Sequence, residues 1–290
     1  MSGNSLILGA GGMLGSMLRL HLKLKAQDSL FFQSRFDSKG ISLVWHLGVS
    51  EFSELKRFIL ENNIKKVVML YGGRAAEGVD DSAELELIGS CFDIFYQANV
   101  TKVLVASSAA IYAKNDTERY SESDAVSECD PYQKKKINLE LLSKEFAKKF
   151  KDLSLLRFGN VLGADSLTKL YVYSKSHNFL LNKYNNGFLK RSYLSPSSLA
   201  YVIGELLYLN SNLPVTLNVA TYEELYMDKI MRSLGVSFCE KKIDGRGNNV
   251  MLDTTLLGSL FELPLKYKDV DFAMTDLENF KLWVGEQASE

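Results

Sequence analysis

Short apolar runs alternate with longer amphipathic stretches through the first half of the chain. In the longer stretches apolar residues recur at helical spacing, so that Phe52, Leu55 and Ile59 would share one face of a helix. The short runs predict strands at 5–8, 29–33, 42–45, 67–71, 102–106 and 153–158, and the long stretches predict helices at 13–25, 52–62, 83–98 and 132–150. Nearly continuous apolar strands separated by helices are typical of a parallel sheet that is covered on both faces. The pattern therefore predicts an α/β fold.

The alternation becomes less regular beyond Gly163. Strand-like and helix-like patterns still alternate there, but without a regular strand–helix order, in segments 198–209, 215–219 and 222–234. The chain has four prolines and no low-complexity tract, so nothing in the sequence marks a linker between two halves. We therefore expect one domain over residues 1–165 and a smaller region over 166–290 that packs on it, with some elements returning to the sheet.

Composition argues against several classes of function. The 290 residues are 46% hydrophobic and 24% charged with a net charge of -1, a balance that does not suggest a nucleic-acid surface or a polybasic membrane patch. No stretch approaches the roughly 20 apolar residues of a membrane helix, and the N-terminus lacks the basic region of a signal peptide. The three cysteines form no CxxC pair and the three histidines are far apart, so neither disulfides nor a metal site is expected. We expect a soluble cytoplasmic enzyme or binding protein.

A glycine-rich loop lies between the first predicted strand and the first predicted helix. A G-x-x-G-x-x-G spacing is matched by Gly9, Gly12 and Gly15, whereas G-x-G-x-x-G would need glycine where Leu14 stands. Glycines here allow a tight turn and let backbone N–H groups approach a pyrophosphate at the helix N-terminus. The alternative is a strand–helix turn that uses glycine only for positive φ. The position of the loop favours dinucleotide binding through the three glycines, Met13 and Leu14.

The end of the second strand sets the choice of dinucleotide. An acidic residue there would accept hydrogen bonds from the ribose hydroxyls of NAD. This chain has Ser34 and Arg35 instead, with no acid before Asp37. A hydroxyl beside a guanidinium suits a 2′-phosphate, so NADP is favoured and NAD remains an alternative. Arg35 could also be a solvated loop charge.

Tyr132 and Lys136 stand four residues apart at the start of a predicted helix, so both would project from one face. A tyrosine-rich and lysine-rich chain is expected to contain about one such pair by chance, and the run 134–136 could simply be a solvated helix face. Two features favour a functional pair. Asp130 and the following proline give a plausible helix start, and the strand at 102–106 leads into Ser108 at the carboxyl edge of the sheet.

Serine, tyrosine and lysine together can move a proton at a carbonyl or hydroxyl oxygen. A phenol with a reference pKa near 10 is a poor acid or base at neutral pH. A neighbouring ammonium and an oxidised nicotinamide both favour the phenolate and bring its pKa toward the working range. The serine hydrogen-bonds the same substrate oxygen, and the tyrosine transfers a proton while hydride moves to or from the nicotinamide.

Four segments carry a resemblance to a known family. They are the glycine loop, 107–112 (Ser-Ser-Ala-Ala-Ile-Tyr), 132–136 (Tyr-Gln-Lys-Lys-Lys) and 156–163 (Leu-Arg-Phe-Gly-Asn-Val-Leu-Gly). Together they resemble the extended short-chain dehydrogenase/reductases, the NAD(P)-dependent epimerase/dehydratase group that modifies nucleotide sugars. The resemblance implies a Rossmann-type doubly wound parallel sheet with a small C-terminal substrate-binding region. It also implies a homodimer that pairs through the helices at 83–98 and 132–150.

The resemblance assigns roles to individual residues. It implies that Ser108 is the catalytic serine that contacts the substrate, with Ser107 as its structural neighbour. Tyr132 would be the general acid/base, and Lys136 would bind the nicotinamide ribose and lower the pKa of the tyrosine. Asn160 matches the asparagine of the family that contacts the substrate diphosphate.

Two later arginines match family segments less closely. The segment 191–200 looks like the family pattern R-D-[FY]-[IV]-x-V-x-D-L-A, and 246–253 looks like its late R-x-G-D segment. Arg191 and Arg246 are therefore candidate ligands of a nucleotide diphosphate, for which the planar guanidinium is well suited. Each could instead be a surface arginine.

Other positions depart from the family. The asparagine that usually precedes the Gly-Thr of the fourth helix is missing, since 88–90 reads Ile-Gly-Ser. Where an aspartate commonly holds the adenine, the chain has His46 and Leu47. After the fourth strand it has Tyr71 followed by Gly72 and Gly73, small residues expected near the cofactor phosphates.

The most informative departure concerns the reaction. Dehydratases of this family place an Asp-Glu pair just after the catalytic residue, and here Ala109 and Ala110 stand in those positions. Without these carboxylates we do not expect 4,6-dehydratase activity. What remains is 4-epimerisation or reduction of a 4-keto sugar, and the glycine loop is also similar to that of dTDP-4-dehydrorhamnose reductases. A catalytically weak dinucleotide-sensing or scaffolding protein with the same fold is the alternative.

Overall fold

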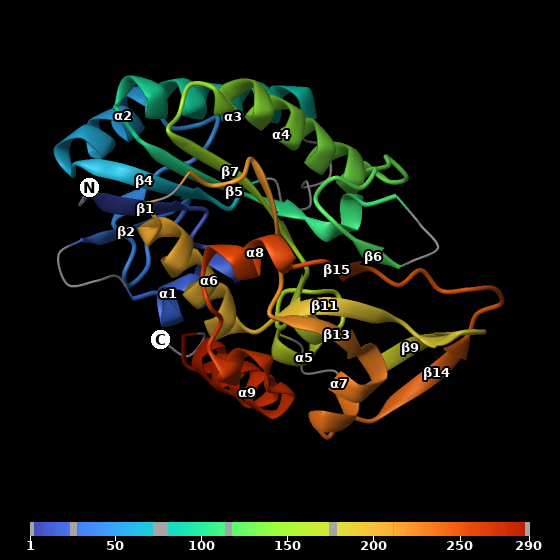
Figure 1. The fold of residues 1–290 in the computed structure, drawn as a ribbon. Coiled ribbons are helices and arrows are strands. Elements are labelled where there is room, and N and C mark those ends of the chain that lie inside the picture. The colour runs from blue at the N-terminus through green and yellow to red at the C-terminus, as the bar shows by residue number, and fades with distance from the viewer. Residues whose placement is uncertain are drawn as a thin grey trace. The chain divides into compact units, whose positions relative to one another are not determined.

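Seven strands form the main sheet, in the order β12-β7-β5-β4-β1-β2-β3 (Figure 1). They are β1 (Asn4–Leu8), β2 (Leu30–Ser34), β3 (Leu43–Val44), β4 (Ile64–Met69), β5 (Lys102–Ser108), β7 (Asp152–Phe158) and β12 (Thr216–Val219). The pairs β1–β2, β1–β4, β2–β3 and β4–β5 are parallel. The chain extends from β1 in one direction and then returns to continue on its other side, which is the strand order of a Rossmann fold. The predicted fold class is confirmed.

The computed structural model describes residues 3–23, 28–71, 81–113, 118–173, 179–210 and 212–287. These residues form two compact units. The first consists of Met1–Ile111, Val126–Arg157 and Ala200–Leu217, and the second of Tyr112–Ala125, Phe158–Leu199 and Asn218–Glu290.

Helices cover both faces of the sheet in the first unit. They are α1 (Met13–His21), α2 (Phe52–Glu61), α3 (Asp81–Gln97), α4 (Pro131–Ala147) and the part of α6 (Pro196–Tyr208) from Ala200 onward. Apolar side chains of α2, α3 and α4 pack with alternate residues of β1, β4 and β5 in one buried cluster, which includes Leu55, Phe92 and Val67. The intervening strand residues, such as Val68, are buried as well. Burial on both faces explains the nearly continuous apolar strands of the sequence.

Buried lysines explain where strand boundaries differ from the prediction. β4 begins at Ile64, before the predicted residue 67, and includes Lys66. The Lys66 ammonium lies 3.0 Å from Asp28 Oδ2 and 4.7 Å from the centre of the Tyr208 ring. Lys102, at the start of β5, donates hydrogen bonds to the carbonyls of residues 206 and 209 at the end of α6. Both lysines are buried because partners from distant segments compensate their charge.

The second unit contains three small sheets and short helices. The sheets have the orders β13-β11-β8, β10-β9-β14 and β15-β6. Their strands are β6 (Arg119–Tyr120), β8 (Asn160–Val161), β9 (Phe179–Tyr184), β10 (Gly187–Phe188), β11 (Lys190–Leu194), β13 (Tyr222–Tyr226), β14 (Phe238–Lys242) and β15 (Met251–Leu252). The helices are α5 (Thr168–Tyr173), α7 (Met227–Ser233), α8 (Thr255–Leu260) and α9 (Val270–Gln287). The predicted segment 222–234 is thus a strand and a helix, because residues 222–226 pair with β11. Within the described ranges, no helix is long and apolar enough to cross a membrane.

Candidate active site

The glycine loop after β1 is shaped by close contacts that leave no room for side chains. Gly9 has φ +83°, and a Cβ at Gly15 would lie 2.4 Å from the Cα of Ala10. A Cβ at Gly11 would lie 2.5 Å from Ser34 Oγ. Helix α1 begins just beyond. Its N-cap residue is Gly12, which has no side chain to accept hydrogen bonds from the N–H groups of the first turn. A cradle of this kind, lined by backbone amides at a helix N-terminus, fits the pyrophosphate of a dinucleotide.

Gln33 holds the loop in place. Its Oε1 accepts hydrogen bonds from the Gly9 N–H (2.8 Å) and from the Tyr71 hydroxyl (2.8 Å). Its Nε2 donates to the carbonyl oxygen of Trp45. One buried amide thus connects the ends of four strands, β1 to β4, at the carboxyl edge of the sheet. The sequence pattern does not predict this role, and its only signal is a polar residue at the end of an apolar strand.

The residues predicted to select the cofactor follow β2 and β3 at the same edge. Ser34 is the last residue of β2 and is buried, whereas the next residue, Arg35, is exposed with its guanidinium 5.7 Å from the Phe36 ring. His46 and Leu47 follow β3 and are half-buried, and the His46 N–H donates to Ser50 Oγ at 3.0 Å. Gly72 and Gly73 lie outside the described residues. Tyr71 is half-buried, and burial raises the pKa of its phenol well above the ordinary value.

Helix α4 carries Tyr132 and Lys136 and is connected to the segment that follows Ser108. Asp130 caps the helix by accepting from the Gln133 N–H at 2.9 Å, and a proline occupies its first turn, as the sequence predicts. The Gln133 side chain then donates to the carbonyl of Ala110 at 2.7 Å, two residues after Ser108. Ser108 Oγ accepts from the Ala110 N–H at 3.2 Å.

The ammonium of Lys136 is buried beneath this helix. Its Nζ donates to the carbonyl oxygen of Ala106 in β5 at 2.8 Å. Burial, together with the charge of Lys135, lowers the pKa of Lys136 to about 8, although Glu84 and Glu140 act in the opposite direction. Tyr132, one turn earlier on α4, is half-buried. The structure therefore places an ammonium group with a lowered pKa on α4, which bears Tyr132, and in contact with β5, which bears Ser108.

Lys135 is also buried, so the interpretation of 134–136 as a solvated face is wrong for two of its three residues. Its Nζ lies 2.5 Å from Glu84 Oε2 on α3. The family asparagine is missing from this helix, and the Glu84–Lys135 ion pair instead places two further charges around Lys136. Only Lys134 remains exposed among these three residues.

A second buried ion pair connects β5, α4 and β7. Glu140 accepts from Ser107 Oγ at 2.7 Å and from Arg157 Nε and Nη2 at 2.9 and 2.8 Å. All three side chains are buried. Ser107 thus faces the interior of the unit, whereas the next residue, Ser108, is partly exposed. Alternation along β5 separates the two hydroxyls.

The low pKa of Lys136 predicts a specific pH dependence of stability. Below about pH 8 this lysine is protonated in both the folded and the unfolded protein. Between about pH 8 and its reference pKa of 10.5, the unfolded chain still binds a proton that the folded protein has released. The wild type should therefore gain stability relative to Lys136→Met across this range, by about 3 kcal/mol in all.

Urea unfolding at a series of pH values measures the effect. Lys134→Met is the matched control, and its difference from the wild type should not vary over the same range. Lys102 also titrates near pH 8, but it is present in every variant and cancels in the differences. A difference between wild type and Lys136→Met that is independent of pH would contradict the prediction.

The residues predicted to bind a diphosphate lie in the second unit. Asn160 begins β8 and is paired with Tyr193 of β11. Arg191, two residues earlier on β11, donates from Nη1 to the carbonyls of Lys190 (2.8 Å) and Asn248 (2.6 Å). Burial lowers the pKa of Arg191. Among the described residues, no carboxylate lies within 4.0 Å of its guanidinium, which is the condition expected of a ligand for an external anion.

Arg246 lies in the same cluster but is more exposed. Its Nη2 donates to Glu118 Oε1 at 3.0 Å. The other carboxylate oxygen of Glu118 accepts from Asn249 Nδ2 at 2.8 Å. The charge of Glu118 also attracts Arg191. The structure therefore brings both predicted arginines together around one acidic residue that the sequence did not single out.

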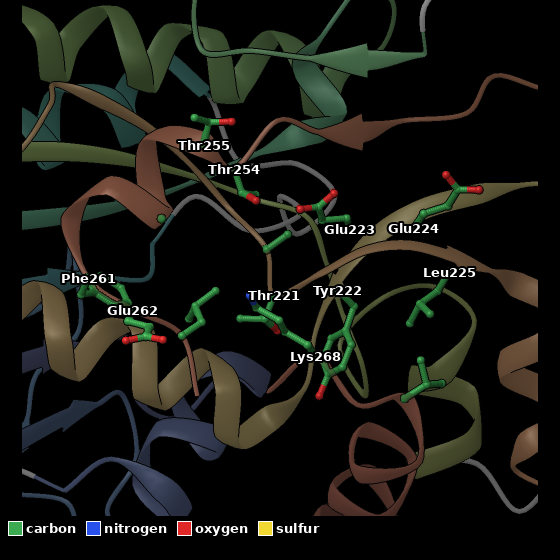
Figure 2. Close-up of a pocket in the computed structure, with 14 residues that line it drawn as sticks. Thr221, Tyr222, Glu223, Glu224, Leu225, Thr254, Thr255, Phe261, Glu262 and Lys268 are labelled. Carbon is green, nitrogen blue, oxygen red and sulfur yellow. The ribbon is translucent and has the colours of Figure 1, made fainter. Parts of the chain in front are cut away.

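A pocket of about 530 Å³ opens elsewhere in the second unit, between β13 and α8. Figure 2 shows that Glu223, Thr254 and Glu262 surround it. No residue of the predicted site lines this pocket. Across the described part of the chain, no group of three His, Cys, Asp or Glu side chains is arranged to hold a metal ion.

Comparison with known proteins defines the class. The model of the NAD dependent epimerase/dehydratase family matches residues 5–185. The chain therefore belongs to this family, as its motifs indicate. A search of curated proteins finds no match to the chain.

Solved structures share the fold at low identity. A UDP-glucose-4-epimerase from Stenotrophomonas maltophila, with bound NAD and formylated UDP-arabinopyranose, superposes with a TM-score of 0.78 at 15% identity and covers 98% of this chain and 99% of its own. MoeE5 in complex with UDP-glucuronic acid and NAD has a TM-score of 0.74 at 19% identity, covering 97% and 100%. TunA, an NAD-dependent NDP-hexosamine 5,6-dehydratase, has a TM-score of 0.75 at 15% identity, covering 96% and 97%. At these identities the likeness establishes the fold alone.

Proposed function

We propose that this protein is an NAD(P)-dependent oxidoreductase that acts at C4 of a nucleotide sugar, by 4-keto reduction or 4-epimerisation. The observation that supports this most strongly is the buried Lys136 ammonium, bonded to β5 one helical turn after Tyr132. A cation in this position stabilises a phenolate. Family membership and the UDP-sugars bound in two of the similar solved structures support the same class of substrate.

Residues of the chain itself transfer the proton and orient the substrate oxygen. Tyr132 donates a proton to the C4 carbonyl oxygen, or removes one from the C4 hydroxyl, and Lys136 favours its phenolate form. Ser108 hydrogen-bonds the same oxygen and orients it. The dinucleotide, when bound, supplies or accepts the hydride.

Residues at the carboxyl edge of the sheet would hold the cofactor. The backbone amides at the start of α1 bind the pyrophosphate, and Ser34 with Arg35 favours NADP through its 2′-phosphate, although NAD remains possible. The set proposed to contact the cofactor is Gly9, Gly12, Met13, Leu14, Gly15, Ser34, Arg35, His46, Leu47, Tyr71, Tyr132 and Lys136, with Gly72 and Gly73 beyond the described residues.

The region 166–290 is proposed to bind the nucleotide sugar. Arg191 and Arg246 of this region contact the diphosphate together with Asn160, which precedes the region in the chain. Ala109 and Ala110, in the turn after β5, provide no carboxylate for a dehydration. A homodimer through α3 and α4, and a cytoplasmic location, remain predictions.

The nucleotide released from freshly purified protein tests the function. We expect mass spectrometry of the denatured protein to find either stoichiometric NAD or a site that takes up NADPH. Retained NAD favours epimerisation, because an epimerase returns the hydride to the same substrate. Exchangeable NADPH favours reduction, and 4-keto sugar nucleotides should then oxidise it. No retained nucleotide and no binding of either cofactor would contradict the proposal.

A further inference from the structure

A carboxylate lies among the basic side chains that we assign to the substrate diphosphate. Glu118 Oε1 accepts from Arg246 Nη2 at 3.0 Å, and Oε2 accepts from Asn249 Nδ2 at 2.8 Å. Its charge also acts on Arg191 and Lys190 of the neighbouring strand. The Glu118 charge therefore acts on Arg246, Arg191 and Lys190 at a place where an anionic ligand is expected, although Lys190 also pairs with Glu224 at 3.0 Å.

The backbone of Glu118 is fixed in an unusual conformation. Its φ of +57° is rare for a residue with a side chain. The Glu118 carbonyl accepts from the Met251 N–H at 2.9 Å, at the point where β6 begins to pair with β15. Its side chain is 14% exposed, and the hydrogen bond from Asn249 contributes most to holding the pKa of its carboxyl below the usual range. Glu118 is thus an ionised, well-anchored group.

The two arginines differ in how they are satisfied. Arg191 donates to two backbone carbonyls, and the charge of Glu118 acts on it without a hydrogen bond among the described contacts. Arg246, whose side chain is 66% exposed, has the Glu118 carboxylate as its ion-pair partner. A diphosphate that bound both arginines would have to compete with that carboxylate for Arg246.

We propose that Glu118 is a specificity-determining residue of the diphosphate site, because its carboxylate occupies on Arg246 the place that a phosphate must take. This inference rests on the proposed function, which assigns Arg191 and Arg246 to the diphosphate. A ligand with one phosphate group gains too little from Arg246 to displace Glu118, whereas a nucleoside diphosphate brings more charge and more acceptors. Glu118 thereby selects nucleoside diphosphates over nucleoside monophosphates.

Titration calorimetry with UDP, dTDP and UMP on the full chain tests the inference. Glu118→Gln keeps the shape of the side chain and removes its charge. We expect this variant to bind UDP or dTDP about three- to tenfold more tightly than the wild type. This range is expected when the partly exposed Glu118–Arg246 ion pair and the repulsion between the Glu118 carboxylate and the diphosphate are both removed. The preference for UDP over UMP should narrow. Glu240→Gln is the matched control, since Glu240 pairs with Lys183 in the same unit at 2.9 Å, and it should bind as the wild type does.

Arginine variants distinguish failure of this inference from failure of the proposed function. If Arg191→Met and Arg246→Met weaken nucleoside diphosphate binding but Glu118→Gln leaves it unchanged or weaker, the inference alone is wrong. If the wild type binds neither UDP nor dTDP, or the arginine variants bind as well as it does, both are wrong. Thermal unfolding checks that each variant is folded, and Glu118→Ala provides the same loss of charge should the glutamine variant fail to fold.

Discussion

Replacement of Tyr132 by phenylalanine should lower kcat by about 10²–10⁴-fold while cofactor binding is retained. The substitution removes only the phenolic hydroxyl, which we propose transfers the proton at the C4 oxygen, and losses of this size are typical of a general acid or base. Tyr132 is the second residue of α4, and the cap formed by Asp130 and Gln133 does not involve its side chain. Steady-state kinetics and nucleotide titration on the same preparation measure both effects.

Tyr96→Phe is the matched control. Tyr96 lies on α3 in the same unit and is 54% exposed, so loss of its hydroxyl should leave kcat unchanged. The comparison also separates an enzyme from a dinucleotide-sensing protein with this fold. If Tyr132→Phe turns over as fast as the wild type, Tyr132 is not the proton donor and the proposed mechanism is wrong.

Replacement of Arg157 by methionine should lower the free energy of unfolding by about 3–5 kcal/mol, because the Glu140 carboxylate would lose two hydrogen bonds and its buried counter-ion, and the Lys144 ammonium that remains 3.5 Å away is 43% exposed. Arg157 makes two hydrogen bonds to Glu140, and both side chains are almost completely buried. The double variant Glu140→Leu/Arg157→Met should recover most of this loss, since it removes both charges of the pair. Urea unfolding measures all three proteins.

A surface ion pair provides the control for this effect. Arg232 lies 3.5 Å from Asp228, and its side chain is 63% exposed. Arg232→Met should cost less than about 1 kcal/mol, because exposed pairs are screened by water and salt. A similar cost for Arg157→Met and Arg232→Met would show that the Glu140–Arg157 pair does not support the sheet and α4 as we infer.

Most of the fold could be predicted from local pattern. The apolar strands and amphipathic helices of the first half were located within a few residues, because side-chain periodicity reports which faces are buried. The segment 222–234 was harder, since its break into β13 and α7 depends on pairing with β11, which is distant in the sequence. β4 begins at Ile64, before the predicted start at residue 67, because the polar Lys66 interrupts the apolar pattern of its first residues.

The candidate site was predicted in part. The structure places Ser108, Tyr132 and Lys136 on neighbouring elements of one unit and gathers Arg191 and Arg246 in the other, but their roles remain predictions. Gln33, Lys135 and Glu118 were not singled out as site residues. Each has its significance only through partners distant in the chain, which no local pattern reveals.

By itself, the sequence determined the parallel sheet, the glycine turn after its first strand and the family, because these depend on residue spacing and on backbone freedom at glycine. Only the tertiary structure decided which charged groups are buried and what compensates them. Lys136 reaches the carbonyl of residue 106, and Glu118 reaches Arg246 across 128 residues of chain. A charge is stable in the interior only where folding brings a partner to it, so the electrostatics of the site is a property of the assembled fold.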